Sequence, residues 1–232
     1  MNFQKKMNLN GNDIKAFAFD MDGTLVCSTW IDYLAWKFLF DDYNISFHYN
    51  EYVKILGVKS SEVIKIKLKV TSEELSDMLR RKLEYFKEIV KKTGIETVPY
   101  AEAFLKEIKN KAFRMALATG ARREKFNFVF ENIKFASYFD AFVTGDDVKL
   151  GKPDPEIFIK AAKKLGILPS QMVVIEDAKN GVHAAKNAGC KCIAITTTTA
   201  REDLSDADLI IDSYRALRIE KIMRSIFPIS SH

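Results

Sequence analysis

The chain has 232 residues, of which 47% are hydrophobic, and a formal net charge of +5. This length and apolar content are enough for one large domain, or a domain with a smaller insertion, and exclude a disordered tail. The charge is dispersed, since residues 27–97 carry 12 Lys and Arg against 11 Asp and Glu, and no nucleic-acid surface is predicted. No apolar run approaches the roughly 18 residues that a membrane span needs. Residues 1–13 lack the apolar stretch of a signal peptide, so a cytoplasmic protein is expected.

Short apolar runs bounded by polar or turn residues recur along the chain, at 16–19, 113–118, 172–175, 192–195 and 209–211. Between the later runs lie segments with a period near 3.6, such as "PEIFIKAAKKLGI" and "NGVHAAKNAGC", which is typical of amphipathic helices. Runs that are apolar on both faces and alternate with helices predict a parallel sheet covered on both sides. The predicted fold class is α/β, with a Rossmann-like parallel sheet as its core.

Residues 27–97 follow a different pattern, without a comparable buried strand. They read as several amphipathic helices, one of which begins at the capping box "TSEE" and runs towards Lys92. Connections in compact domains usually have about 2 to 6 residues, so this segment is too long for a simple loop. We therefore predict a helical cap domain at 27–97, inserted into a core domain made of 1–26 and 98–232. The last residues, 224–232, are expected to be irregular.

Oxygen-bearing side chains follow three of the predicted strands. The first apolar run ends in Asp20, the second in Thr119 and Gly120, and the third in Glu176 and Asp177. In open parallel sheets, ligands bind outside the carboxyl ends of the strands. These residues are therefore predicted to line one rim of the sheet.

The residue types at this rim favour phosphoryl transfer. Asp20 can attack a phosphorus atom and form an aspartyl phosphate, while Asp22 can protonate the leaving oxygen and later deprotonate a water. Two carboxylates repel a phosphate, so a cation is required, and Asp20 with Asp177 could hold Mg²⁺. Glu176 is expected to act indirectly through a water. Lys152 could bind the transferring phosphoryl oxygens.

Thr119 and Gly120 complete the predicted phosphate site. The Thr119 hydroxyl can donate to a phosphate oxygen, and Gly120 allows a backbone N–H to approach closely at the start of a helix. An isolated Asp, Lys or Thr-Gly pair at such a position is usually a turn or a surface feature. Together, a nucleophile, an acid/base, a metal ligand, a cation and a hydroxyl at one rim predict an active site.

These residues resemble the motifs of the haloacid dehalogenase superfamily, in its branch with a helical cap that contains phosphoglycolate phosphatase and β-phosphoglucomutase relatives. The motifs are "FDMDGTL", "LATGA", "GKPDPEIF" and "VIEDAKNGVHAAKNAG", and the resemblance covers about residues 13–212. It implies Asp20 as nucleophile and Mg²⁺ ligand, and Asp22 as acid/base with its carbonyl on the metal. It also implies Asp177 as a direct metal ligand and Glu176 as an indirect one. Phosphate contacts are implied for Thr119 and Lys152.

The expected activity is hydrolysis of a small phosphorylated metabolite, of the sugar phosphate or phosphoglycolate type, and a β-phosphoglucomutase-type mutase is the alternative. Such mutases have a His in the first cap helix, where Asp32 stands, and an Arg in the loop near "GVKSSE", which here offers Lys59 and Ser60. Lys does not reproduce the bidentate contact of Arg to a second phosphate, so hydrolysis is favoured.

The same residues bear on two other activities. A phosphonate hydrolase with a Schiff-base Lys in the cap stays open. A receiver-like signalling domain is disfavoured by the cap insertion and by the Asp20/Asp22 pair. The substrate is not identified by the sequence, and the chain is expected to be a monomer or weak dimer.

Overall fold

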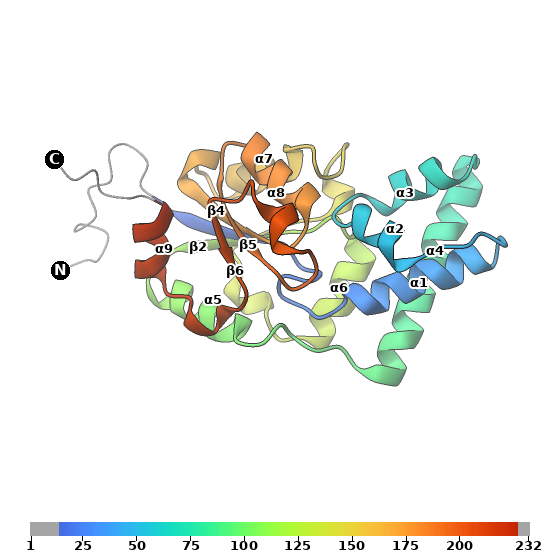
Figure 1. Cartoon of the computed structure of the whole chain (residues 1–232), viewed down its shortest axis with the longest axis horizontal. Helices are drawn as coiled ribbons and strands as arrows, with labels where there is room; N and C mark the ends of the chain where they lie inside the picture. Colours follow the sequence, from blue (N-terminus) through green and yellow to red (C-terminus); the bar gives the residue numbers. More distant parts are fainter. Residues whose placement is uncertain (1–13, 227–232) are drawn as a thin grey trace.

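The computed structural model describes residues 14–226, which form one six-stranded parallel sheet with helices around it (Figure 1). The strand order is β3-β2-β1-β4-β5-β6. The strands are β1 (Ala16–Phe19), β2 (Arg114–Ala118), β3 (Ala141–Val143), β4 (Met172–Glu176), β5 (Lys191–Ile195) and β6 (Leu209–Ile211). The predicted α/β class with a parallel sheet core is confirmed.

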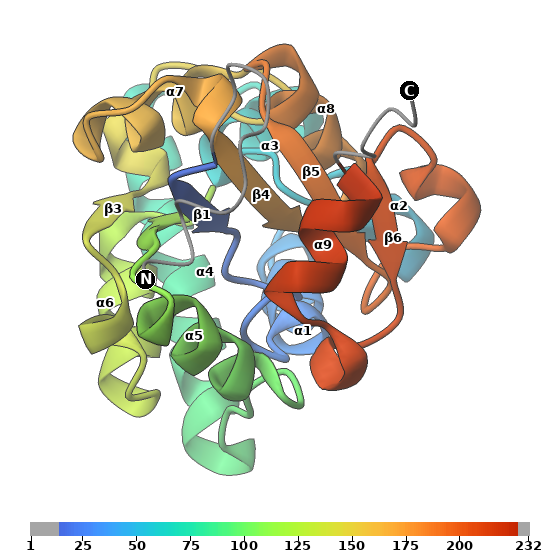
Figure 2. The same ribbon diagram turned by 90° about the vertical axis from the view of Figure 1, so that its left-hand side faces the viewer.

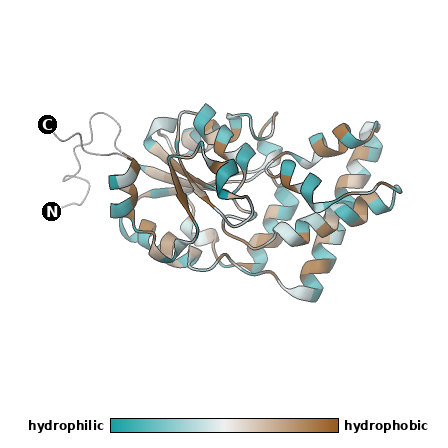
Figure 3. Cartoon of the chain, in the orientation of Figure 1, coloured by the Kyte–Doolittle hydropathy of each residue, from teal (hydrophilic) through white to brown (hydrophobic). Residues whose placement is uncertain are grey.

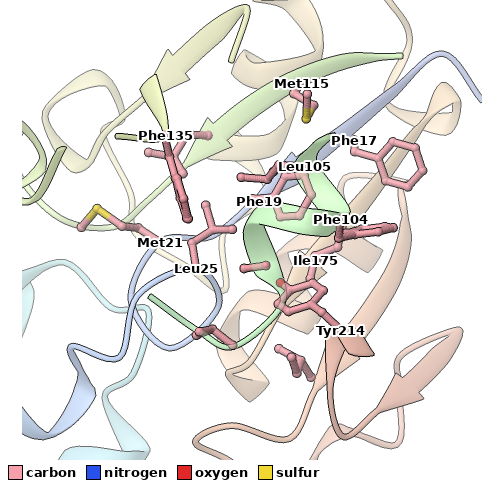
Figure 4. Packing of buried hydrophobic residues seen from close by; sticks show 14 of the residues in the cluster. Phe17, Phe19, Met21, Leu25, Phe104, Leu105, Met115, Phe135, Ile175 and Tyr214 are labelled. Atoms are coloured by element: carbon pink, nitrogen blue, oxygen red, sulfur yellow. The ribbon is translucent and has the colours of Figure 1, made fainter. Parts of the chain in front are cut away.

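Strand β1 lies in the middle of the sheet, and its sequence gives the two faces different characters. Ala16 and Ala18 point to one face, Phe17 and Phe19 to the other, and all four are fully buried. On the Phe face, both rings pack edge-on against Phe104, within the cluster seen in Figure 4. On the Ala face, the small side chains let helices approach the sheet closely.

Helices cover both faces of the sheet (Figure 2). The Phe face carries α5 (Ala101–Asn110), α6 (Arg123–Asn132) and α9 (Ile219–Ile226), while the Ala face carries α7 (Glu156–Lys164) and α8 (Lys179–Asn187). Short 3₁₀ turns are Ala136–Tyr138, Gly145–Asp147, Pro169–Gln171, Arg201–Leu204 and Tyr214–Ala216. The strands are mostly brown in Figure 3, as expected for a sheet that is buried on both faces.

Four helices between β1 and α5 lie beyond the carboxyl ends of the strands and are called the cap below (Figure 1). They are α1 (Thr29–Asp41), α2 (Tyr49–Lys54), α3 (Ser60–Lys67) and α4 (Ser72–Thr93). The predicted capping box is present: the Glu74 N–H donates to Thr71 Oγ1 at 3.2 Å, and the Thr71 N–H donates to the Glu74 carboxylate at 2.7 Å.

Two chain segments connect the cap to the rest of the molecule, and they lie side by side. Val26 and Thr97 form an antiparallel bridge. The Cys27 N–H donates to the Glu96 carbonyl at 2.8 Å, and the Val98 N–H donates to the Leu25 carbonyl at 2.8 Å. The division into a core domain and a cap domain at these points stays a prediction.

The structure corrects the expected elements in two places. Strand β3 was not expected, because it has only three residues and pairs on one side alone, so it gives no clear apolar pattern. The irregular end expected at 224–232 is wrong as far as Ile226, because α9 buries Ile219, Ile222, Met223 and Ile226 against the core. The rest of that segment, and the expectation for residues 1–13, lie outside the described residues. Within 14–226, no helix is both long and apolar enough to cross a membrane.

Candidate active site

The predicted residues meet at the point where the strand order reverses. Strand β1 lies between β2 and β4, and the three strands run parallel. Their carboxyl ends therefore bring Asp20, Thr119, Glu176 and Asp177 to the same edge of the sheet. Such a reversal leaves a crevice beyond the strand ends, where ligands bind in this class of fold.

Lys152 is the cation at the centre of this site and is only 1% exposed. Its ammonium donates to Asp20 Oδ1 at 2.6 Å, to the Ala118 carbonyl at 3.2 Å and to Glu176 Oε1. Burial opposes the charge, but the two carboxylates outweigh burial and hold the pKa of Lys152 above its usual range. The lysine is therefore a fixed positive charge beside the proposed nucleophile.

The carboxylates outnumber the cations in this buried region. Burial raises the pKa of Asp20 to about 7; Lys152 opposes this increase, and Glu176 and Asp22 add to it. Burial, Glu176 and Asp20 also raise the pKa of Asp177 well above its usual range. The raised pKa values indicate a site that lacks positive charge.

Asp177 and Glu176 are held in place by neighbouring polar groups. Thr24 Oγ1 donates to Asp177 Oδ1 at 2.8 Å, and the Thr198 hydroxyl donates to the other carboxylate oxygen. Glu176 Oε2 accepts from the N–H groups of Asp177 at 2.9 Å and Ala178 at 3.1 Å. Both carboxylates thus have fixed orientations.

The donor set fits a hard divalent cation such as Mg²⁺. Among residues 14–226, no three His, Cys, Asp or Glu side chains stand close enough to hold a metal by themselves. Mg²⁺ is commonly bound through one or two carboxylates together with substrate phosphate and water. Asp20 and Asp177 could supply the carboxylates, the Asp22 carbonyl could add a further oxygen, and the excess of negative charge favours a cation.

Asp22 contacts a second cluster of charges at the boundary with the cap. The Ser28 hydroxyl donates to Asp22 Oδ1, and the Lys125 ammonium lies 2.9 Å from the same oxygen. Lys125 also donates to Asp32 Oδ1 at 2.7 Å, and Lys82 donates to that oxygen at 2.7 Å. The cluster therefore alternates in sign from Asp22 through Lys125 and Asp32 to Lys82.

The pKa shifts in this cluster follow from burial and neighbouring charge. Burial alone would raise the pKa of Asp32, but Lys125 and Lys82 outweigh burial and hold that pKa well below its usual range. Burial also opposes the charge of Lys125, yet Asp22 and Asp32 raise its pKa. Lys82 has one close carboxylate, and burial prevails, so its pKa is lowered. Asp32 and Lys125 are thus firmly ionised.

The sequence analysis did not single out Lys82 or Lys125. A signal for Lys82 was available, because Met78, Lys82, Phe86 and Val90 follow each other at intervals of four along α4 and are all buried. A lysine within the apolar stripe of a helix needs a buried partner. Lys125 gives a weaker signal, since α6 begins with the charged residues "REK", and only the fold distinguishes the buried Lys125 from its more exposed neighbours.

Thr119 and Gly120 lie at the rim directly under a cap loop. Thr119 is 1% exposed, and its hydroxyl accepts from the Ala121 N–H at 3.1 Å. A Cβ built on Gly120 would lie 2.9 Å from the Gly57 carbonyl oxygen of the cap, so a larger residue would obstruct this approach. The loop therefore closes over the predicted phosphate site.

A cavity lies between the rim and the cap. Asp20, Asp22 and Thr119 line it from below, and Trp36 and Ser60 line it from the cap. Lys59 points elsewhere and donates to the Val148 carbonyl at 2.7 Å. Arg122, which the sequence analysis also missed, lines the cavity on the core side.

Comparisons with known proteins show which family the chain resembles. The family described as "Haloacid dehalogenase-like hydrolase" matches residues 17–195. A phosphorylated carbohydrates phosphatase of Thermotoga maritima is 32% identical over 182 residues, which is 78% of this chain and 84% of that protein. The β-phosphoglucomutase of Bacillus subtilis is 26% identical over 89% of this chain and 93% of its own length.

A solved structure shares the architecture of both parts of the molecule. The crystal structure of a β-phosphoglucomutase from Clostridium difficile superposes with a TM-score of 0.82 and 26% identity, over 92% of this chain and 97% of that one. The resemblance inferred from the four sequence motifs is confirmed. The chain belongs to the haloacid dehalogenase-like hydrolase family.

Proposed function

We propose that the protein is a Mg²⁺-dependent phosphatase that hydrolyses a small phosphorylated metabolite through an aspartyl phosphate. The observation that carries the proposal is the position of Asp20, which lies at the end of the central strand against the Lys152 ammonium and faces the cavity. Its neighbours Asp22 and Asp177 supply an acid/base and a metal ligand at the same rim. The similarity to a phosphorylated carbohydrates phosphatase supports a sugar phosphate as the substrate.

The proposed reaction has two steps, formation and hydrolysis of the aspartyl phosphate. The Asp20 carboxylate attacks phosphorus while the ester P–O bond breaks, and Asp22 gives its proton to the leaving oxygen. Asp22 then takes a proton from water as the water oxygen attacks the phosphorus of the aspartyl phosphate. Inorganic phosphate leaves, and the Asp20 carboxylate is restored. Bound Mg²⁺ would supply the positive charge that keeps Asp20 and Asp177 ionised.

Lys152, Thr119 and Gly120 bind and orient the phosphoryl group. The Lys152 ammonium donates to Asp20. It could also donate to the oxygens of a phosphoryl group that is bound beside Asp20. Thr119 turns its hydroxyl, and Gly120 its N–H, towards the same group. The cap loop over Gly120 excludes bulk water from the phosphoryl group.

A phosphosugar mutase is the second candidate, because Arg122 lines the cavity and could hold a second phosphate. Two features of the cap favour hydrolysis instead. Ser60 faces the cavity at the loop where such mutases carry an Arg, and Lys59 is directed to a core carbonyl. Asp32 is engaged by two lysines in place of a His.

The test is phosphate release from sugar phosphates, phosphoglycolate and nucleoside monophosphates, with and without Mg²⁺. Conversion of glucose 1-phosphate to glucose 6-phosphate is followed in parallel. We expect Mg²⁺-dependent release that falls to background in Asp20→Asn, with an unchanged circular dichroism spectrum. Isomerisation without net release would identify a mutase, and full activity of Asp20→Asn would refute the proposed nucleophile.

A further inference from the structure

Asp22, whose side chain is 20% exposed, and the buried Lys125, Asp32 and Lys82 form a series of alternating charges, called the ion chain below. The three links are short: 2.9 Å from Asp22 to Lys125, 2.7 Å from Lys125 to Asp32 and 2.7 Å from Asp32 to Lys82. The side chains of Lys125 and Asp32 are each 10% exposed, and that of Lys82 is 7% exposed. Water therefore screens these contacts only weakly.

The ion chain crosses from one part of the molecule to the other at a single link. Asp32 on α1 and Lys82 on α4 belong to the cap, whereas Asp22 follows β1 and Lys125 lies on α6. If the cap moves away from the core, Lys125–Asp32 is the one link of the ion chain that breaks. Each side then retains one carboxylate and one ammonium, so neither part exposes an unpaired buried charge. The arrangement allows repeated separation at a low electrostatic cost.

Stability alone does not explain these charges. A buried ion pair is often no more stabilising than apolar residues of similar volume, because desolvation offsets the attraction. The surroundings are apolar enough for such residues: Lys125 lies 4.5 Å from the centre of the Phe86 ring, and Lys82 lies 4.5 Å from the Trp36 ring. Apolar residues at these positions could not make the contact that Lys125 makes with Asp22.

We infer that Lys125 is a positioning residue for Asp22 and holds its carboxylate towards the leaving oxygen when the cap lies over the core. This inference rests on the proposed function. With the cap closed, Asp32 fixes the Lys125 ammonium from one side, and Lys125 and Ser28 together fix Asp22 Oδ1 from the other. With the cap open, Lys125 loses its anchor on Asp32. Proton transfer to the leaving group is thereby coupled to closure over the substrate.

The experiment compares two substrates that depend differently on proton donation. p-Nitrophenyl phosphate has a good leaving group and needs little protonation, whereas a sugar phosphate has a poor one. Lys125→Met is expected to lower kcat at least about tenfold for the best sugar phosphate of the panel but under about threefold for p-nitrophenyl phosphate, with a smaller change in KM. Lys125→Arg, which keeps the charge, should restore much of the loss.

Lys59→Met is the matched control, because Lys59 also joins the cap to the core but its ammonium donates to the Val148 and Lys149 carbonyls instead of contacting Asp22. It should affect both substrates alike. Equal losses on both substrates in Lys125→Met, or no loss, would overturn the inference. If Lys125→Met does not fold, Lys125→Gln serves for the same comparison. If the proposed function is wrong, the wild-type protein releases no phosphate from either substrate, and the inference is wrong as well. If only the inference is wrong, the wild-type protein is active and Lys125→Met does not distinguish the two substrates.

Discussion

At the scale of single residues, the site is short of positive charge. Asp20, Glu176 and Asp177 are all nearly fully buried, and Lys152 is the ammonium that contacts two of them. The pKa of Asp20 is raised to about 7 and that of Asp177 well above its usual range, both chiefly by burial. Near pH 6 the metal-free protein therefore binds protons where a metal would bind.

Mg²⁺ and protons should compete for this site. Because the ligands must be deprotonated and the pKa values of Asp20 and Asp177 are both raised, Mg²⁺ affinity is expected to increase as pH rises through about 7. The measurement is the rise in Tm on adding Mg²⁺, which should be larger at about pH 8 than at about pH 5.5. Asp177→Asn should lose the Mg²⁺ effect at both pH values. A Mg²⁺ effect independent of pH would contradict the assignment.

The predicted site residues could be found from the sequence because each adjoins a recognisable strand or motif. Asp20, Thr119 and Asp177 come directly after apolar runs, and parallel pairing necessarily brings those ends together. Lys125 has no such local marker, and Lys82 has only its place in the apolar stripe of α4; their partner Asp32 is 93 and 50 residues away respectively. The Lys82–Asp32 contact comes from the packing of α4 on α1 within the cap, and the Lys125–Asp32 contact comes from the packing of the cap on the core.

At the scale of elements, helix α8 and the loop before α3 connect the core to the cap. The Asn180 amide donates to the Leu56 carbonyl at 2.9 Å and the Lys54 carbonyl at 3.3 Å. Both carbonyls belong to the cap segment that leads to Gly57, whose carbonyl lies over Gly120. Asn180 therefore helps to hold this loop over the phosphate site.

Asn180→Ala should weaken substrate binding more than chemistry. Loss of a neutral hydrogen bond of about 0.5–1.5 kcal/mol predicts a KM increase of about two- to tenfold with kcat nearly unchanged. Asn187→Ala is a matched control, because Asn187 lies on the same helix but donates to Pro153, within the core. Steady-state kinetics of both variants provide the check, and an equal KM increase in the two would argue against a role of Asn180 in closure.

The long elements could be predicted from the sequence more reliably than the short ones. Helix α4 has a capping box and 22 residues of amphipathic pattern, and β1 has a fully apolar sequence, so both were predicted. Strand β3 has three residues at the sheet edge, so its local pattern is weak, whereas α9 does have a helical spacing at Ile219, Ile222, Met223 and Ile226 that the prediction did not use. Pairing with β2 and packing against the core stabilise these elements instead.

At the scale of the whole molecule, the base of the cap shares its apolar packing with the sheet. Ile31 and Ala35 of α1 and Phe86 and Val90 of α4 belong to the same buried cluster as Phe17. A separate cluster, which includes Trp36 and Phe40, lies within the cap. The shared cluster predicts that the two parts unfold together.

Phe86→Ala should lower the free energy of unfolding by about 3–5 kcal/mol, because Phe86 is fully buried at this boundary. Phe38→Ala, at a cap ring that is 41% exposed, should cost less than about 1 kcal/mol. The check is urea unfolding followed by tryptophan fluorescence and circular dichroism. Both Trp residues lie in the cap, so coincident transitions indicate joint unfolding, and two separate transitions would contradict it.

The paired connections at Val26 and Thr97 also determine how a ligand reaches the site. Both segments leave the core side by side and are joined by backbone hydrogen bonds. The covalent connection between cap and core therefore lies along one edge of the cap. Figure 1 shows α3 on the side of the cap away from the connection between α4 and α5, and Lys59 and Glu62 at the start of α3 contact Val148 and Gly151. If the cap opens on these connections, we expect that far edge to open first, so that substrate enters and phosphate leaves past the start of α3.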